Sequence, residues 1–313
     1  MIETVTKVFR RDLKLMGNRF EFAVVGENEE WANLCIQEGI NEVQRIEKLL
    51  TTYSDSSQTY QINEHAGDIP VKVDWEVFNL IERSLRISQL TQGAFDITYG
   101  SIDKKLWNFD KNMTTLPDAV TAKKMVRLIN FRIVILDRQN QTVFLRKKGM
   151  RIGFGGIGKG YAADRAKNVM RLAGVESGIV NAAGDLTVWG TQPNGKEWMI
   201  GIADPTTKHF PFGSMTLTNK SVATSGNYEK YAIIDGIKYS HTIDPKTGYP
   251  VRGMKSVTII CGSAEISDAM ATPVMVMGIK AGIHLIDQMK GIACIVIDDN
   301  NNIHTSKNIN LTN

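Results

Sequence analysis

The amino-acid sequence predicts an α+β fold in a single domain that spans residues 1–313. Helix-like and strand-like patterns are mixed along the chain, without the regular strand–helix–strand alternation of a doubly wound sheet. Hydrophobic residues make up 42% of the chain and charged residues 22%, which is an ordinary globular composition. A chain of 313 residues is long enough to bury a large core.

The first half of the chain is expected to form one strand and three helices. Residues 19–25 (RFEFAVV) have the apolar character of a strand. The first helix should follow Asn28, because an asparagine side chain caps the free N–H groups at a helix start. A second helix is expected over about residues 74–91 and a third after Pro117. The block at residues 93–100 (GAFDITYG) is expected to be a loop.

The second half should contain most of the strands. Two strands, RIVIL and QTVFLR, precede a glycine-rich segment at residues 149–160, which leads into a helix that ends at Gly174. Three strands follow (SGIVN, DLTVWG and EWMIGI), then a hairpin that turns at Asp235-Gly236. After a further strand, SVTIIC, we expect helices over about residues 264–277 and 281–289 and a final hairpin.

Charge and cysteine content argue against several classes of protein. The formal net charge is +4 with no basic run, which argues against nucleic-acid binding. Cys35, Cys261 and Cys294 are an odd number and lack Cys-x-x-Cys spacing, so neither a disulfide framework nor a zinc site is indicated. Two of them lie in apolar runs, which is typical of buried structural thiols.

The apolar runs bear on the cellular compartment. No run reaches the length of a transmembrane segment, and the first residues lack the apolar core of a signal peptide. We therefore expect a cytoplasmic protein without a transmembrane segment. If an export signal has been removed from the natural chain, the protein would instead be periplasmic or membrane-associated.

The segment Gly153–Gly160 (GFGGIGKG) partly matches two phosphate-binding motifs. It fits G-x-G-x-x-G and the first part of a P-loop, but Gly160 stands where a P-loop has Ser or Thr. A dinucleotide fold needs an acidic residue at the end of the next strand, and Glu176 precedes that strand. What remains is a glycine-lined helix start, which suits a phosphate because its N–H groups are unpaired. A tight helix entry without a ligand explains the segment equally well.

Asp268 and Thr272 are four residues apart in an expected helix, so their side chains should lie on one face. Carboxylate and hydroxyl oxygens suit magnesium or calcium and not zinc. Pro273 lacks an N–H group and leaves the carbonyl of Ala269 without its helical partner. Taken alone, the pair is more simply explained as an ordinary helix end with a solvated aspartate.

A third candidate segment lies at the exit of the expected hairpin. His241 and Asp244 flank this exit, where a histidine beside an aspartate can act as a general base or can stabilise a turn. Residues 244–248 (DPKTG) have the composition of a turn. Residues 224–226 (TSG) can position a phosphate or form a plain turn, and they are not the G-x-S-x-G elbow of serine hydrolases.

Eight segments, taken in order, resemble the ApbE family of FAD:protein FMN transferases and cover nearly the whole chain. They are Leu15–Gly17, Thr52–Ser54 with Asn63, Gly93–Gly100, Gly155–Asp164 (GGIGKGYAAD), Asn181–Gly190 (NAAGDLTVWG), Thr224–Tyr228 (TSGNY), Ser240–Pro250 (SHTIDPKTGYP) and Ser267–Thr272 with Met277-Gly278. Any one of them is modest support, whereas eight in the family's order are specific.

The resemblance implies a fold related to T-fold barrels, with FAD in a cleft between two closely joined lobes. The residues implied to line the flavin nucleotide are Met16, Tyr53, Ala94, Phe95, Asp96, Gly155 and Tyr161, to which we add Thr224 and Thr242. The side chains of Asp268 and Thr272, with the backbone carbonyl of Gly158, are implied to hold Mg2+ on the pyrophosphate.

The implied reaction is magnesium-dependent transfer of the FMN half of FAD to a Thr or Ser hydroxyl of another protein, with release of AMP. Lys159 would stabilise charge on the phosphorus, His241 would act as general base, and Asp244 would orient His241. The expected acceptor is a flavoprotein subunit of a sodium-pumping or related electron-transfer complex. A FAD pyrophosphatase that releases FMN and AMP, or a non-enzymatic FAD-binding protein, are the alternatives.

Several positions depart from the family pattern. Asn18 replaces a threonine, Ala183 replaces a glycine, and Lys230 replaces an arginine. Gly158 replaces an alanine, which leaves a carbonyl ligand unaffected. Gly153 stands where the family usually has an aspartate before the glycine loop. This last departure bears most on ligand affinity or rate.

Overall fold

The computed structural model describes residues 6–103, 115–203, 211–226, 231–234, 236–240 and 242–309. Helices and strands mix there as predicted, so the α+β class is confirmed. The helices are α1 (Glu29–Leu50), α2 (Gln58–Glu64), α3 (Trp75–Leu90), α4 (Ala119–Met125), α5 (Gly158–Leu172), α6 (Ala264–Met277) and α7 (Ile279–Asp287), with the 3-10 helices η1 (Ile97–Ser101) and η2 (Phe131–Ile133). Within these ranges, no helix combines the length and the apolar character that a membrane crossing requires.

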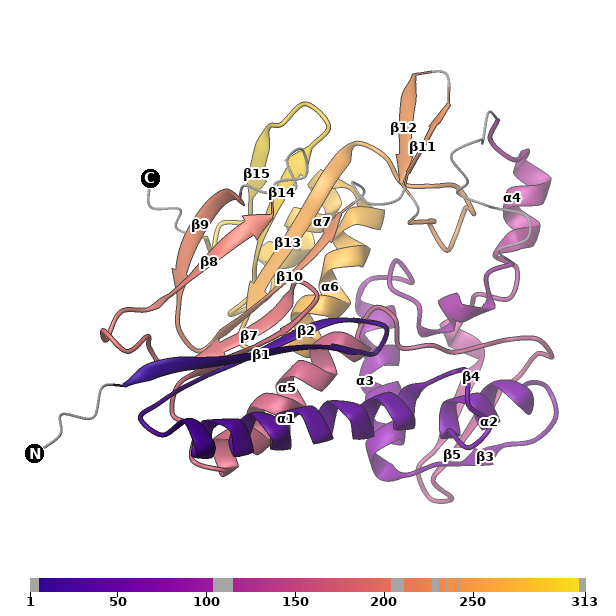
Figure 1. The fold of residues 1–313 in the computed structure, drawn as a ribbon. Coiled ribbons are helices and arrows are strands. Elements are labelled where there is room, and N and C mark those ends of the chain that lie inside the picture. The colour runs from indigo at the N-terminus through magenta and orange to yellow at the C-terminus, as the bar shows by residue number, and fades with distance from the viewer. Residues whose placement is uncertain are drawn as a thin grey trace, which may run out of the picture.

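One large antiparallel sheet lies at the centre of the structure (Figure 1). Its strand order is β1-β2-β6-β7-β10-β13-β14-β15. These strands are β1 (Lys7–Leu15), β2 (Asn18–Gly26), β6 (Gly178–Ala182), β7 (Asp185–Trp189), β10 (Lys220–Gly226), β13 (Met254–Cys261), β14 (Ala293–Asp298) and β15 (Ile303–Thr305). Because β2 pairs with β6, the first hairpin of the chain joins the sheet that the second half builds.

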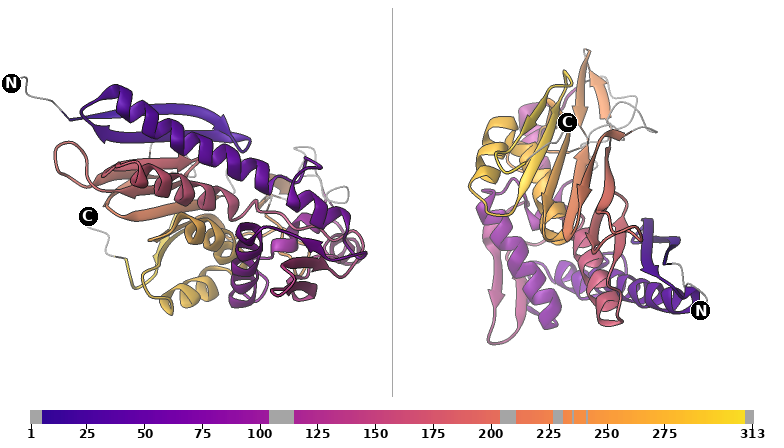
Figure 2. Two further views of the ribbon diagram at one scale, coloured as in Figure 1. Left: turned by 90° about the horizontal axis from the view of Figure 1, so that it is seen from below. Right: turned by 90° about the vertical axis from the view of Figure 1, so that its left-hand side faces the viewer.

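Helices cover one face of this sheet and a strand pair covers the other (Figures 1 and 2). Helix α5 packs between α1 and α6, and α6 lies against β10 and β13. The alternation of strand side chains supplies both faces: Val180 belongs to the core under the helices, and Ile179 to a second apolar cluster. Strands β8 (Trp198–Ala203) and β9 (Pro211–Leu217) cover that second cluster with residues such as Trp198.

A second group of elements lies beside the large sheet (Figure 1). It contains α2, α3 and a small sheet in the order β3-β5-β4, made of β3 (Val71–Lys72), β5 (Thr142–Leu145) and β4 (Val134–Asp137). Its apolar residues share one core with the large sheet, and Arg83 of α3 donates two hydrogen bonds to Glu265 of α6, at 2.6 and 3.0 Å. A separate hairpin, β11 (Tyr231–Ile234) and β12 (Ile237–Ser240), projects from the sheet.

Five helices and strands lie where the sequence patterns predicted none: β1, α2, β3, β9 and β10. Strand β1 (KVFRRDLKL) has mostly exposed, charged residues and therefore no apolar run. It forms because it pairs with β2 along its whole length, from Lys7 opposite Gly26 to Leu15 opposite Asn18. The expected loop at residues 93–100 contains most of η1, whereas the other predicted helices differ from the observed ones by only a few residues.

Candidate active site

The candidate site begins at the glycine segment that enters α5. The Gly153 N–H donates to the Ile97 carbonyl at 3.0 Å, and the Gly158 N–H donates to the Phe154 carbonyl at 2.6 Å. The N-cap residue of α5 is Ile157, whose side chain forms no hydrogen bond to the helix start. A Cβ atom built on Gly153 or Gly155 would meet nothing within 4 Å, so the backbone there borders open space. The segment thus leaves room for a ligand beside the start of α5.

A carboxylate from the neighbouring helix caps this helix start. The Gly160 N–H, in the first turn of α5, donates to Oδ2 of Asp268 on α6 at 3.0 Å. The helices can approach because Gly160 has no side chain: a Cβ there would lie 2.1 Å from the Ala264 carbonyl oxygen. Asp268 is 7% exposed. One of the N–H groups that the sequence made available for phosphate is therefore already paired within the protein.

Lys159 forms an ion pair with Asp185, the first residue of β7. Asp185 is 3% exposed, and its carboxylate also accepts a hydrogen bond from the backbone of Thr224 on β10. Helix α5, β7 and β10 thus meet at one buried carboxylate. We call Lys159, Asp185, Asp268, Thr272 and Ser225 the polar cluster.

The electrostatics of the polar cluster favour an additional positive charge. Burial, together with the neighbouring Asp185 carboxylate, raises the pKa of Asp268 to about 7. Burial also raises the pKa of Asp185, and the Lys159 ammonium opposes this shift. Both carboxylates are buried beside a single lysine, so their ionised forms leave one negative charge that the lysine does not balance.

Thr272 lies one turn after Asp268 on α6, as the spacing predicted. Its hydroxyl and the Ser225 hydroxyl of β10 are 2.9 Å apart. The described residues contain no group of three or more His, Cys, Asp or Glu that could hold a metal ion. A site with one carboxylate and one hydroxyl still fits magnesium, which keeps water and phosphate oxygens among its ligands. The donor set and the excess negative charge therefore fit a divalent cation of this kind.

Several residues assigned to the flavin nucleotide border the glycine segment. The Met16 Cε atom would lie 3.7 Å from a Cβ on Gly158, and a ring carbon of Phe95 would lie 3.6 Å from a Cβ on Gly156. Ala94 is buried beside Phe95. Tyr53, in the turn after α1, is 94% exposed. An exposed aromatic ring of this size is available to stack on a ligand.

The polar atoms of two other residues assigned to the nucleotide form hydrogen bonds within the protein. Asp96 accepts the backbone N–H and hydroxyl of Thr98, at 2.8 and 2.6 Å, and the Phe131 N–H at 3.0 Å. Burial raises its pKa. The Tyr161 hydroxyl donates to Glu76 of α3 at 2.5 Å. Both side chains therefore order the walls of the region, and their contact with a ligand stays a prediction.

The hairpin segment is only partly within the described residues, and His241 lies outside them. Asp244 accepts the Lys246 N–H at 2.8 Å and the Thr247 hydroxyl at 3.0 Å, which is the turn its sequence predicted. The backbone of Thr242 bonds to Ser240 and Val251. The orientation of His241 by Asp244 stays a prediction.

Thr224 lies on β10 beside the polar cluster. Its hydroxyl is 2.9 Å from the hydroxyl of Thr258 on β13. A hydroxyl can serve as donor and acceptor at once, so this pairing leaves Thr224 with further hydrogen-bonding capacity. Its contact with a nucleotide stays a prediction.

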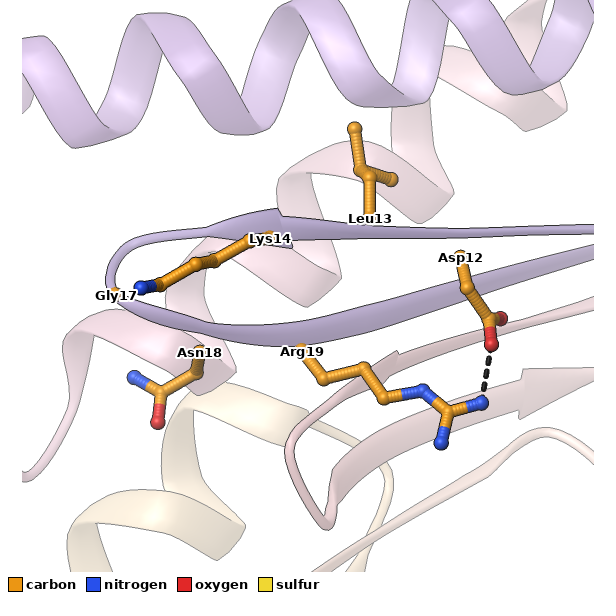
Figure 3. A pocket seen from close by; sticks show the side chains of 6 residues that line it. All are labelled: Asp12, Leu13, Lys14, Gly17, Asn18 and Arg19. Carbon is orange, nitrogen blue, oxygen red and sulfur yellow. Dashed lines mark hydrogen bonds and ion pairs between the residues drawn. The ribbon is translucent and has the colours of Figure 1, made fainter.

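A shallow surface hollow lies elsewhere, at the β1–β2 hairpin (Figure 3). It measures about 320 Å³ and is lined by Asp12, Leu13, Lys14, Gly17, Asn18 and Arg19. Arg19 pairs with Asp12 across its rim. None of its lining residues belongs to the polar cluster, so we do not place the chemistry there.

Sequence reasoning missed Asp185 and Ser225 as members of the site. The sequence did hold a signal for Asp185. This residue follows the Ala183-Gly184 pair and starts a largely apolar strand (DLTVW), where an aspartate is uncommon. Ser225 was considered only within residues 224–226, as part of a phosphate-positioning segment or a plain turn, although it lies in β10. Both are brought to α5 and α6 by strand pairing that the sequence pattern does not reveal.

Known proteins share the fold and part of the sequence of this chain. The ApbE protein of Thermotoga maritima superposes with a TM-score of 0.85 at 29% identity, covering 96% of this chain and 97% of that one. The apo flavinyl transferase ApbE of Pseudomonas stutzeri gives a TM-score of 0.83 at 26% identity, covering 98% and 97%. A FAD:protein FMN transferase of Klebsiella pneumoniae is 32% identical over 299 residues, which are 95% of this chain and 91% of the relative. One of Treponema pallidum is 30% identical over 290 residues, 88% and 80% of the two chains.

The fold, the site and these relatives define an enzyme of the transferase class. The ApbE family model matches residues 16–296, and the chain therefore belongs to the ApbE family.

Proposed function

We propose that this enzyme transfers the FMN half of FAD to a Thr or Ser hydroxyl of an acceptor protein and releases AMP, in a reaction that depends on Mg2+. The names of its relatives support the flavin transferase activity. The observation that carries the proposal is the polar cluster, which places two buried carboxylates and a lysine beside a glycine segment that borders open space.

The side chains of Asp268 and Thr272 and the carbonyl of Gly158 would hold the magnesium ion. All three donors are oxygens, which magnesium prefers. When bound, the ion would neutralise charge on the pyrophosphate and on the departing AMP. The ion pair with Asp185 of β7 holds the Lys159 ammonium at the polar cluster.

The protein's part in the reaction is mainly alignment and charge stabilisation. The acceptor oxygen forms a bond to the FMN phosphorus, and the bond between this phosphorus and the AMP phosphate oxygen breaks. Lys159 stabilises the charge on the transferring phosphoryl group. His241 accepts the hydroxyl proton and Asp244 orients the imidazole. Near-normal transfer by His241→Ala at neutral pH would remove the histidine from this scheme.

The proposed acceptor is a flavin-carrying subunit of a sodium-pumping or related electron-transfer complex. A transferase of this kind requires a partner protein whose hydroxyl reaches the phosphorus. The open space beside Gly153 and Gly155 supports access to the glycine segment from outside.

The test mixes the protein with FAD, Mg2+ and an acceptor domain that carries a Thr target, followed by denaturing electrophoresis. Flavin fluorescence on the acceptor band is expected, and it should disappear with EDTA and fall strongly in Asp268→Asn. Asp12→Asn is the matched control, since Asp12 is an exposed aspartate at the β1–β2 hairpin, outside the polar cluster. Free FMN and AMP beside a dark band would instead identify a hydrolase, and intact FAD would identify a binding protein.

A further inference from the structure

Helices α5 and α6 cap each other. Asp268 of α6 accepts the N–H of Gly160 in the first turn of α5, at 3.0 Å. Asp164 of α5 accepts the N–H of Glu265 in the first turn of α6, also at 3.0 Å. Each helix start therefore receives a carboxylate from the other helix, which accepts a free N–H group of the first turn and lies at the positive dipole end.

The Asp164 half of this arrangement is well defined. One oxygen, Oδ2, accepts both the Glu265 N–H and the Ser263 hydroxyl, the latter at 2.7 Å. Ser263 is itself the N-cap residue of α6, and its hydroxyl oxygen accepts the Ile266 N–H at 3.3 Å. Asp164 thus holds the cap and the first turn of α6 together.

Two further contacts hold the first turn of α6, one to α3 and one to Gly160 of α5. Arg83 of α3 binds both carboxylate oxygens of Glu265. The Ala264 carbonyl approaches Gly160 so closely that no side chain fits between them. Contacts from α5 and α3 therefore hold the start of α6. Asp164 and Arg83 both bind Glu265, and Asp268 lies three residues further along α6.

We propose that Asp164 is a positioning residue for the cation site: by holding the first turn of α6 on α5, it sets Asp268 and Thr272 in the geometry that binds the divalent cation. The inference rests on the proposed function, because it concerns the same site. Asp164 acts through the backbone and cap of α6 and is not a metal ligand. The residues that orient metal ligands contribute strongly to affinity even without touching the metal.

The substitution Asp164→Asn separates geometry from charge. Both hydrogen bonds reach a single oxygen of Asp164, and an asparagine can place its amide oxygen there and keep both. Asp164→Ala removes both bonds. The matched control is Asn28→Ala. This change removes the N-cap of α1, in which the Asn28 side chain accepts the Trp31 N–H, and it lies near the C-terminal end of α5, away from the polar cluster.

The experiment measures Mg2+ binding directly, by isothermal titration calorimetry with and without saturating FAD, on folded protein checked by circular dichroism. We expect Asp164→Ala to weaken Mg2+ binding about 10-fold or more, with Asp164→Asn and Asn28→Ala close to the unaltered protein. The Mg2+ concentration for half-maximal transfer should shift in parallel, while the rate at saturating Mg2+ recovers. If Asp164→Ala does not fold, Ser263→Ala takes its place. This change removes one of the two donors to Asp164 together with the N-cap of α6, and it should also weaken Mg2+ binding.

Three outcomes would count against the inference, and they differ from one another. Unchanged Mg2+ binding by Asp164→Ala overturns the positioning role and leaves the proposed function intact. Equal weakening by Asp164→Asn shows that charge matters and geometry does not. Absence of Mg2+ binding by the unaltered protein, in both arms, overturns the proposed metal site itself and the positioning role with it.

Discussion

Ala183 shows how one residue can carry strain beside the site. It has φ +56° and Gly184 has φ +100°, in the tight turn that connects Ala182 to Asp185. A two-residue turn with both φ values positive favours glycine, because a Cβ atom is crowded in the left-handed region. The resemblance to the family marked this position as one where glycine is usual, and the backbone explains why.

We predict that Ala183→Gly stabilises the protein by about 0.5–1 kcal/mol, since relief of left-handed strain exceeds the entropy that glycine adds to the unfolded chain. Urea unfolding measures the difference. Ala173→Gly is the matched control, because this exposed alanine has φ −78° and the same change should destabilise. Destabilisation at both positions would contradict the strain explanation.

Asp298 is a second single residue with a measurable effect. Hydrogen bonds from His304 and Asn302 hold the pKa of its carboxyl well below the usual value, so the folded state favours the ionised form. The resulting stability is fully present above the unfolded pKa of about 3.9 and is lost as the pH falls below it. We predict that Asp298→Asn lowers the urea midpoint at pH 7 and that the difference shrinks towards pH 3. A difference that stays constant with pH would rule out this linkage.

At the scale of elements, the contact between α5 and α6 decides the site. These helices are far apart in sequence, and they meet at Gly160, where a Cβ atom would lie 2.1 Å from a backbone oxygen. The sequence suggested that the glycines of this segment let a ligand approach. For Gly160 the structure shows instead that a helix approaches, and the ligand explanation remains available for Gly153 and Gly155.

We predict that Gly160→Ala destabilises the protein by about 1–3 kcal/mol or more, because the new methyl group forces two packed helices apart. Gly153→Ala is the control for stability, since its Cβ would meet nothing within 4 Å. Thermal unfolding in EDTA compares the two variants without any contribution from metal. Equal midpoints would show that the helices separate without cost.

At the scale of the whole molecule, one sheet has two apolar cores. The larger core lies under the helices and the smaller one under β8 and β9, where Trp198 is 3% exposed. Because both cores share the same strands, we propose that the chain unfolds as a single domain. The alternation of strand side chains makes this possible, since each buried strand contributes to both faces.

We predict that Trp198→Ala lowers the free energy of unfolding by about 3–5 kcal/mol, as expected for truncating a buried tryptophan. Far-ultraviolet circular dichroism and fluorescence of the remaining tryptophans should still report one coincident transition. Met199→Ala is the control, because its side chain is 69% exposed on the same strand. Two separate transitions would show that β8 and β9 unfold as an independent unit.

The sequence by itself determined the α+β class, most element positions and the residues of α6 that share a face. These follow from local causes: apolar periodicity, helix caps such as Asn28, and the four-residue spacing of Asp268 and Thr272. The ordered motifs also indicated the family, which the family model confirms. Strand β1 was not predicted, because it has no apolar pattern of its own and forms by pairing with β2.

Only the tertiary structure decided which charges meet. Asp185 reaches Lys159 because β7 lies under α5, and Asp164 reaches the start of α6 because Gly160 lets the two helices touch. These contacts join segments up to 108 residues apart, as Gly160 and Asp268 are. Local sequence patterns describe single elements, whereas burial, raised pKa values and mutual capping arise only when the packing of several elements removes water from the groups between them.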